Sequence, residues 1–111
     1  MRSLNSVKII SSDEDKIKTA LSEYAASLKK RREVQEVYLC GSRAKGRHSP
    51  YSDVDLLIII KNGDIKKPHE RVPDFLPDRF PVSLDLFIYT QEEIQKNKFA
   101  QGLLSHGKKI S

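Results

Sequence analysis

The sequence has little that would support a disulfide-stabilised, secreted or membrane-spanning protein. Cys40 is its one cysteine, which excludes an intrachain disulfide and a cysteine-rich zinc module. The first residues lack the apolar stretch of a secretory signal. The longest apolar run, 56–60, is far shorter than the roughly 20 residues that cross a bilayer. We therefore expect a cytoplasmic protein with no membrane partner.

Aromatic residues are also scarce, at 7% of the chain with no tryptophan, so few side chains could stack on nucleic-acid bases. Lys and Arg number 20 against 15 Asp and Glu, which makes the net charge +5 and the pI about 9.4. This excess suits a protein that meets phosphates. With 38% hydrophobic residues in 111, the composition predicts a single domain over residues 1–111 with one modest core.

Two helices are predicted from capping signals and apolar periodicity. Ser11 and Glu14 match a capping box, so we expect the first helix to begin at Ser11 and to end in the basic run 29–32. The residues of its apolar face are Ile17, Leu21, Tyr24 and Leu28. A second capping box at 90–93 predicts a C-terminal helical segment that ends at Gly107.

Three apolar segments, 37–40, 54–60 and 82–89, are predicted to be strands. The second is almost continuously apolar, which is typical of a strand covered on both faces of a sheet. The segment 61–81 is rich in proline and charge and is expected to be a loop, with at most a short helix around 74–75. The predicted fold is therefore α+β, close to α/β: a small mixed sheet backed by two main helices.

A glycine and a serine follow the first predicted strand. Gly41 would let the backbone approach a ligand closely, and Ser42 could cap a short helix whose backbone N–H groups bind phosphate oxygens. The spacing to Gly46 resembles the start of a P-loop, but Arg47 and His48 stand where that loop requires Lys and Ser or Thr. Taken alone, the glycines favour a plain strand-to-helix turn.

Two aspartates precede the apolar part of the second strand. Asp53 and Asp55 are two residues apart, so their side chains would lie on one face of the strand. Carboxylates so close repel one another and are costly to desolvate unless a cation lies between them, and Mg²⁺ prefers such oxygen ligands. The alternative is that Asp53 caps a turn and Asp55 is a surface carboxylate.

A third aspartate, Asp85, interrupts the apolar third strand between Leu84 and Leu86. If this strand pairs beside the second, Asp85 can join the other two acids, and the cluster could hold two metal ions that activate a hydroxyl and stabilise a leaving pyrophosphate. The alternative is a single charge that protects the edge of the sheet from unwanted pairing, which would leave the other two acids unexplained.

Together these residues resemble the nucleotidyltransferases of the DNA polymerase beta superfamily. The matching pieces are Gly41–Ser42, Asp53–Val54–Asp55 and Asp85 after an apolar strand. The likeness is greatest to the stand-alone minimal nucleotidyltransferases, whose Gly-Ser-Arg-Ala-x-Gly and Ser-Asp-x-Asp-Leu signature is reproduced by residues 41–46 and 52–56. The resemblance covers most of the chain.

This resemblance implies specific roles. Gly41 and Ser42 would hold the phosphates of a nucleoside triphosphate, with Arg43 as a further nucleotide-binding residue. Asp53, Asp55 and Asp85 would be the catalytic metal ligands, for two Mg²⁺ ions or for Mn²⁺. The expected substrate is ATP, from which AMP is transferred to a hydroxyl group.

The resemblance also implies partners, because a domain of this size can form little more than one side of such a site. We expect either a homo-oligomer or a complex with a helical HEPN-type toxin. In the complex, the acceptor would be a tyrosine hydroxyl of the toxin, and the chain would act as the antitoxin. Two alternatives stay open: a non-catalytic antitoxin that neutralises its partner by contact, and a nucleic-acid-binding module. Lys45 and Arg47 could supply positive charge near the phosphates or could equally point to solvent. No role is assigned to His48, His69 or His106.

Overall fold

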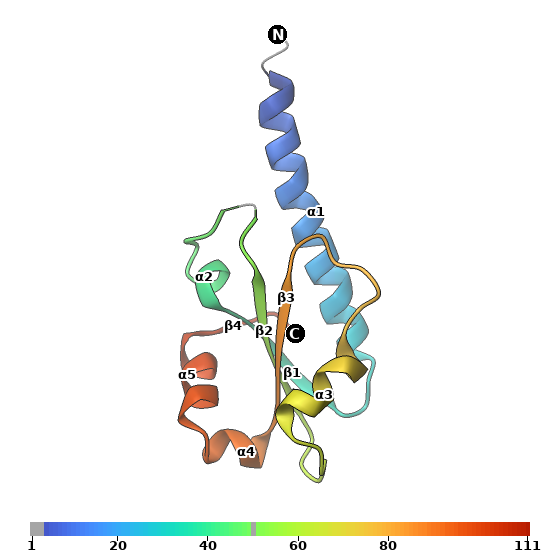
Figure 1. Cartoon of the computed structure of the whole chain (residues 1–111), viewed down its shortest axis with the longest axis vertical. Coiled ribbons are helices and arrows are strands. Elements are labelled where there is room, and N and C mark those ends of the chain that lie inside the picture. The colour runs from blue at the N-terminus through green and yellow to red at the C-terminus, as the bar shows by residue number, and fades with distance from the viewer. Residues whose placement is uncertain (1–3, 50) are drawn as a thin grey trace.

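A four-stranded mixed sheet forms the centre of the computed structural model, which describes the backbone of residues 4–49 and 51–111 and the side chains of 14–49 and 51–111. The strand order is β3-β2-β1-β4 (Figure 1). The strands are β1 (Val34–Cys40), β2 (Val54–Ile60), β3 (Leu84–Thr90) and β4 (Lys108–Lys109). β1 runs antiparallel to β2 and β4, whereas β2 and β3 are parallel. The expected small mixed sheet is confirmed.

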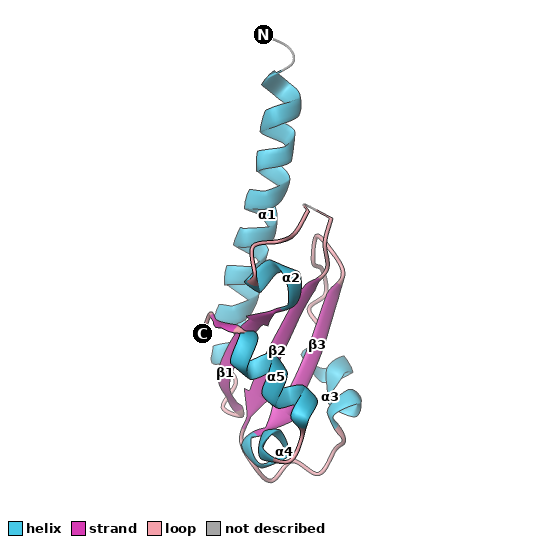
Figure 2. Cartoon of the chain, turned by 90° about the vertical axis from the view of Figure 1, so that its left-hand side faces the viewer, coloured by secondary structure: helices cyan, strands magenta, loops and turns pink. Residues whose placement is uncertain are grey.

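Strand β2 is the core of the molecule because both of its faces are covered. Residues 56–60 are all at most 1% exposed, as their continuous apolar sequence predicts. On one face, Leu56 and Ile58 join the apolar residues of α1 (Leu4–Lys29) and α3 (Pro68–Phe75). On the other, Leu57 and Ile59 pack with residues of α4 (Gln91–Gln95) and α5 (Lys98–His106). Figure 2 shows α4, α5 and the short α2 (Gly41–Ala44) on the same side of the sheet.

The first helix begins earlier than predicted. Ser11 lies inside α1, which starts at Leu4, so the expected capping box at Ser11 and Glu14 is wrong. No glycine or proline precedes Gly41, and serine lowers helix propensity too weakly to set a helix boundary by itself. The predicted end of the helix in the basic run is confirmed at Lys29, and Tyr24 and Leu28 of the predicted apolar face are buried.

Other boundaries differ because they depend on long-range contacts. β1 begins at Val34 rather than 37, and β3 begins at Leu84 rather than 82. The predicted short helix in 61–81 is the eight-residue α3. The capping box at Thr90 is confirmed, but the C-terminal segment is divided in two, because the Asn97 side chain accepts a hydrogen bond from the Ala100 N–H and starts α5. Gly107 follows α5 as predicted. In the described part of the chain the sheet is thus flanked by five helices.

No helix in the described residues combines the length and apolar character that crossing a membrane requires.

Arg71 joins the elements at the end of the sheet opposite the acidic residues. Its side chain is 1% exposed and its guanidinium forms a two-bonded pair with Glu93, at 2.6 and 2.9 Å. It also donates to Asp64 Oδ1 at 3.2 Å and to the Ile88 carbonyl at 3.0 Å. Hydrogen bonding from Arg71 holds the pKa of Glu93 below its ordinary value of 4.5. One buried cation thereby connects α3, β3, α4 and the loop after β2.

Replacing Arg71 should destabilise the fold strongly. Arg71→Met leaves Glu93 and the Ile88 carbonyl without their partner, which should cost about 3 kcal/mol of unfolding free energy by analogy with other broken buried pairs. Urea denaturation measures this. The matched control is Lys66→Met, whose ion pair with Asp74 is half exposed and should matter little.

The same network predicts a pH effect. Since the pKa of Glu93 is lowered in the folded state, its contribution to stability is present above pH 4.5 and is lost as pH falls through the lowered value. The wild type should therefore lose more stability between pH 5 and 3 than Arg71→Met does. Equal losses in the two proteins would contradict this assignment.

Candidate active site

The two strands that carry aspartates are paired in parallel, with Asp55 directly opposite Asp85. Residues opposite one another in such a pair point to the same side of the sheet. This is the side covered by α4 and α5, since Leu57 and Phe87, each two residues further on, belong to that layer. The structure therefore brings Asp55 and Asp85 together as the sequence predicted.

The electrostatics of Asp55 reflect this pairing. Its pKa is raised above the ordinary value, first because the carboxyl is partly desolvated, then because of the charge and hydrogen bond of Asp85, and last because of the charge of Asp53. Asp53 is exposed just before β2, and Asp85 is exposed at the edge of the sheet. Among the side chains that the structure describes, no three acidic, histidine or cysteine groups are already arranged as a metal-ligand set. The site consists of a close carboxylate pair with a third acid nearby.

Gly41 lies against this pair. It follows Cys40, the register partner of Asp55, and has a φ of +67°. A Cβ atom at this position would overlap Oδ2 of Asp55. Gly41 therefore lies close to a carboxylate of the chain itself, and its predicted contact with a phosphate ligand stays a prediction.

Helix α2 starts one residue earlier than the capping prediction required. Its N-cap position is occupied by Cys40 with no side-chain cap, so the expected capping role of Ser42 is wrong. The carbonyl of Ser42 instead accepts hydrogen bonds from the N–H groups of Lys45 and Arg47, which turns the chain sharply after the helix. Gly41 and Ser42 are both exposed beside the carboxylate pair.

Arg43 points into the loop that joins α2 to β2. Its side chain is buried and donates hydrogen bonds to the Ser52 carbonyl at 3.0 and 3.2 Å and to Glu14 Oε1 at 3.2 Å. Glu14 also contacts His48 Nε2 at 3.1 Å, and these two partners lower the pKa of Glu14, His48 first. Arg43 thus connects helix α1 to the loop that precedes Asp53. Its predicted contact with a nucleotide stays a prediction.

Glu14 and Arg71 are the contributing residues that sequence reasoning missed. The sequence pattern places Glu14 in a capping box, whereas its actual partner, Arg43, lies 29 residues further along the chain. Arg71 lies in a stretch read as loop. No short-range pattern signals either contact.

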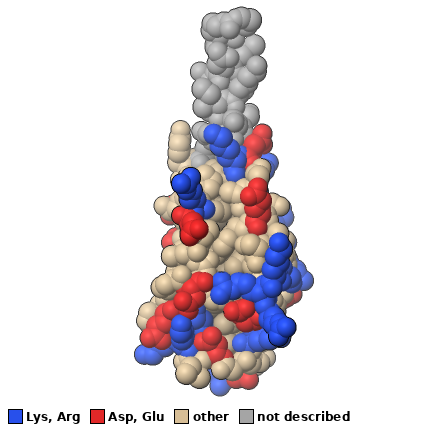
Figure 3. Space-filling model, turned by 90° about the vertical axis from the view of Figure 1, so that its right-hand side faces the viewer, with Lys and Arg blue, Asp and Glu red and all other residues tan. Residues whose placement is uncertain are grey.

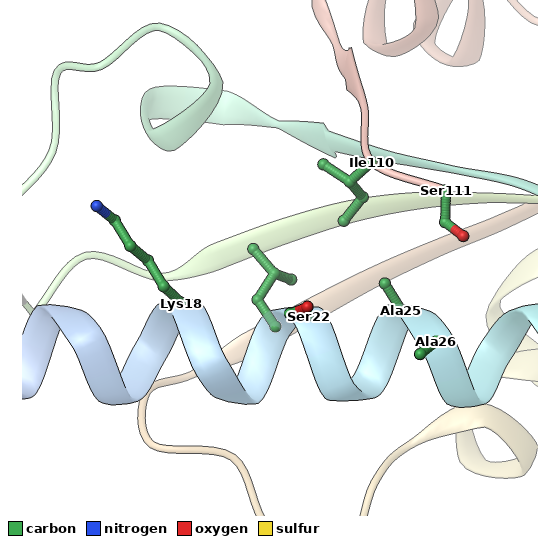
Figure 4. Close-up of a pocket in the computed structure, with 7 residues that line it drawn as sticks. Lys18, Ser22, Ala25, Ala26, Ile110 and Ser111 are labelled. Carbon is green, nitrogen blue, oxygen red and sulfur yellow. The ribbon is translucent and has the colours of Figure 1, made fainter.

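Two cavities lie near these elements. One, of about 330 Å³, lies between α2 and α5 beside Gly41. The other, of about 370 Å³, is a groove between α1 and the C-terminal residues, lined largely by small and apolar side chains and by Lys18 (Figure 4). Ile110 of that groove belongs to the core on the α1 side of the sheet, away from Asp55. Gly41, which lies against Asp55, belongs to the wall of the α2–α5 cavity.

The contact between Gly41 and Asp55 predicts a difference between two glycines of similar conformation. Gly41→Ala and Gly46→Ala each place a side chain at positive φ, at a cost of about 1 kcal/mol or more. Only the Gly41 variant also pushes on Asp55, because nothing lies within 4 Å of a Cβ at Gly46. Gly41→Ala should be the less stable in urea denaturation, and Asp55→Ala should remove the difference. A difference that persists in the Asp55→Ala background would show that another contact causes it.

The chain is similar in sequence and in fold to known nucleotidyltransferase domains. Residues 21–110 match the family model of the nucleotidyltransferase domain. A crystal structure from Sulfolobus solfataricus, of a protein provisionally assigned as a nucleotidyltransferase, superposes with a TM-score of 0.59 at 22% identity, covering 78% of each chain. At that identity it supports the fold alone. No curated protein sequence matches significantly. Since the family model spans most of the chain, including all three aspartates and the Gly41–Ser42 bend, the protein belongs to the nucleotidyltransferase domain family.

Proposed function

We propose that the protein is a metal-dependent nucleotidyltransferase that moves a nucleoside monophosphate from a triphosphate to a hydroxyl acceptor. The observation that carries this proposal is the in-register placement of Asp55 against Asp85, beside the exposed bend at Gly41. A fold has no need of two adjacent carboxylates at this place, since their mutual repulsion opposes ionisation. A bound cation would offset the repulsion between the two carboxylates, which would then serve as its ligands.

The residues fit a hard divalent cation. Asp55 and Asp85 provide neighbouring carboxylate oxygens, and Asp53 lies near enough for its charge to raise the pKa of Asp55. We propose that these three side chains hold Mg²⁺, with Mn²⁺ as the alternative ion. When bound, the metal supplies positive charge that stabilises the phosphates as negative charge develops in the transition state.

The chain's own residues would do the remaining work. Gly41 and Ser42 present exposed backbone next to the carboxylates and would bind the phosphates. Asp85, exposed at the sheet edge, would accept the proton of the acceptor hydroxyl. The acceptor oxygen forms a bond to the α-phosphorus, the bond between that phosphorus and the bridging oxygen of the β-phosphate breaks, and pyrophosphate leaves.

The finer assignments rest on the family resemblance. We propose ATP as the donor, AMP as the transferred group, and as acceptor a tyrosine hydroxyl of a helical HEPN-type toxin that the chain would neutralise. An exposed Asp85 on the outermost strand of the sheet suits a protein acceptor, because a partner can reach its carboxylate from solvent.

On the one side of the molecule that Figure 3 shows, the charge distribution does not favour the alternative of a nucleic-acid-binding module. On the side that carries α1 and α3, acidic and basic side chains lie among one another (Figure 3). Two examples are the pairs Lys66–Asp74 and Arg31–Glu33. A surface for the phosphate backbone would need a stripe of one sign there.

Transfer should depend on the carboxylate pair. With Mg²⁺, α-labelled ATP and a co-expressed partner, the wild type should label the partner. Asp85→Asn should lower the rate at least 100-fold, the usual scale for loss of a general base. Asp78→Asn, an exposed aspartate in the loop before β3, is the matched control and should retain the wild-type rate. Neutralisation of a toxic partner by Asp85→Asn at the wild-type level would favour the contact-only alternative.

A further inference from the structure

The four tyrosines of the chain, all within the described residues, differ in how accessible their hydroxyl groups are. Tyr24 and Tyr89 are buried, and the Tyr24 hydroxyl donates a hydrogen bond to a backbone carbonyl. Tyr38 is half-buried, and its hydroxyl donates to the Glu36 carboxylate at 3.3 Å. Tyr51 is 82% exposed. It therefore offers the one phenolic hydroxyl of the chain that a reacting group can reach freely.

Tyr51 lies beside the candidate active site. It precedes Asp53 by two residues, in the loop between α2 and β2. Two residues of extended chain span at most about 7 Å, so the Cα atoms of Tyr51 and Asp53 are no further apart than that. Figure 1 shows this loop at the end of the sheet where β2 and β3 begin, which is the end that carries Asp55 and Asp85. The phenol is thus tethered near all three acids.

Hydrogen bonds hold the backbone of this loop. The Ser52 N–H donates to the Ser49 carbonyl at 3.1 Å, and the Ser49 N–H donates to Ser52 Oγ at 2.9 Å. The Tyr51 N–H donates to Ser49 Oγ at 3.3 Å. The buried Arg43 donates to the carbonyls of both serines. Since the loop backbone is held in this way, the Tyr51 hydroxyl changes its position chiefly by rotation of the side chain.

The two serine hydroxyls of the loop are engaged with each other. Ser49 Oγ and Ser52 Oγ lie 3.2 Å apart and share a hydrogen bond, in addition to the bonds that they accept from backbone N–H groups. Within the part of the chain that the structure describes, the Tyr51 hydroxyl has no hydrogen-bond partner. Tyr51 therefore carries the hydroxyl of this loop that is available as an acceptor.

We propose that Tyr51 is a modification site of the protein itself: when no partner is present, the chain transfers the nucleoside monophosphate to its own Tyr51. This inference rests on the proposed function and names a second acceptor for it. The Tyr51 phenolic oxygen forms a bond to the α-phosphorus. The bond from that phosphorus to the bridging oxygen of the β-phosphate breaks, and pyrophosphate leaves with the electron pair. The phenolic proton passes to the Asp85 carboxylate.

The short tether favours transfer within one chain over transfer between two copies. Groups joined by short flexible linkers meet at effective concentrations on the order of 1 mM. At a protein concentration of about 1 µM, the chain's own Tyr51 therefore has roughly a 1,000-fold advantage over that of another copy. Self-modification is then first order in protein, so its half-time does not depend on the protein concentration.

Mass spectrometry of the purified chain, incubated alone with Mg²⁺ and ATP, tests the proposal. The intact mass should rise by one nucleoside monophosphate, and peptide mapping should place the added group on Tyr51. Tyr51→Phe, which removes only one oxygen atom from an exposed side chain, should abolish the addition. Tyr38→Phe is the matched control and should be modified like the wild type, because the hydroxyl that it removes is bonded to Glu36.

A second measurement separates an acceptor from a residue that binds the nucleotide. The probe is the soluble phenol N-acetyltyrosinamide, offered in excess as an external acceptor. Tyr51→Phe should label this probe at least as fast as the wild type does, since the internal acceptor no longer competes and the aromatic ring is retained. Slower labelling of the probe by Tyr51→Phe would instead assign Tyr51 to nucleotide binding and would overturn the proposal.

Two further results would overturn it. One is an added group on a residue other than Tyr51. The other is a half-time of self-modification that lengthens in proportion to dilution of the protein. Labelling of the probe or of a co-expressed partner without modification of Tyr51 contradicts this inference and leaves the proposed function intact. Failure of the proposed function is distinct, because then neither Tyr51 nor the probe nor the partner is labelled.

Discussion

The parallel pairing of β2 with β3 is the constraint on which the rest of the site depends. It places Asp55 against Asp85 on the face of the sheet that also carries Gly41. Like charges a few ångströms apart near a protein surface repel by up to about 4 kcal/mol. The five consecutive apolar residues of β2 are all buried and contribute gross stabilisation of roughly 8–15 kcal/mol. The pairing therefore holds despite the repulsion.

Three sets of contacts position the carboxylate pair and the strands that carry it. On one side, Gly41 approaches Asp55 as no other residue could without displacing it. On another, Arg43 and Glu14 fix the loop that ends at Asp53. At the far end of the same strands, Arg71 ties β3 to α3 and α4. The two acids are thus held on paired strands, and Gly41, which lies against Asp55, also lines the cavity between α2 and α5.

The elements that could be predicted from the sequence are those whose signals are local. The apolar run of β2 gave its boundaries at Val54 and Ile60, and the capping box at Thr90 gave the start of α4. The shared face of Asp55 and Asp85 followed from side-chain alternation together with the assumption that their strands are neighbours. The two-residue β4 was not foreseen, because it exists only through its pairing with Tyr38 and Leu39. The partners of Arg43 and Arg71 likewise depend on contacts between distant segments.

The central claim is that the Asp55–Asp85 carboxylate pair binds a divalent cation. Its most direct test is thermal unfolding at pH 7 with and without Mg²⁺. Without divalent ions, Asp85→Asn should melt at a higher temperature than the wild type, because the repulsion on Asp55 is gone. With Mg²⁺, the wild type should gain stability by ligand binding and the variant should not. The account would be contradicted if Mg²⁺ did not change the melting temperature of the wild type and if, without Mg²⁺, Asp85→Asn melted no higher than the wild type.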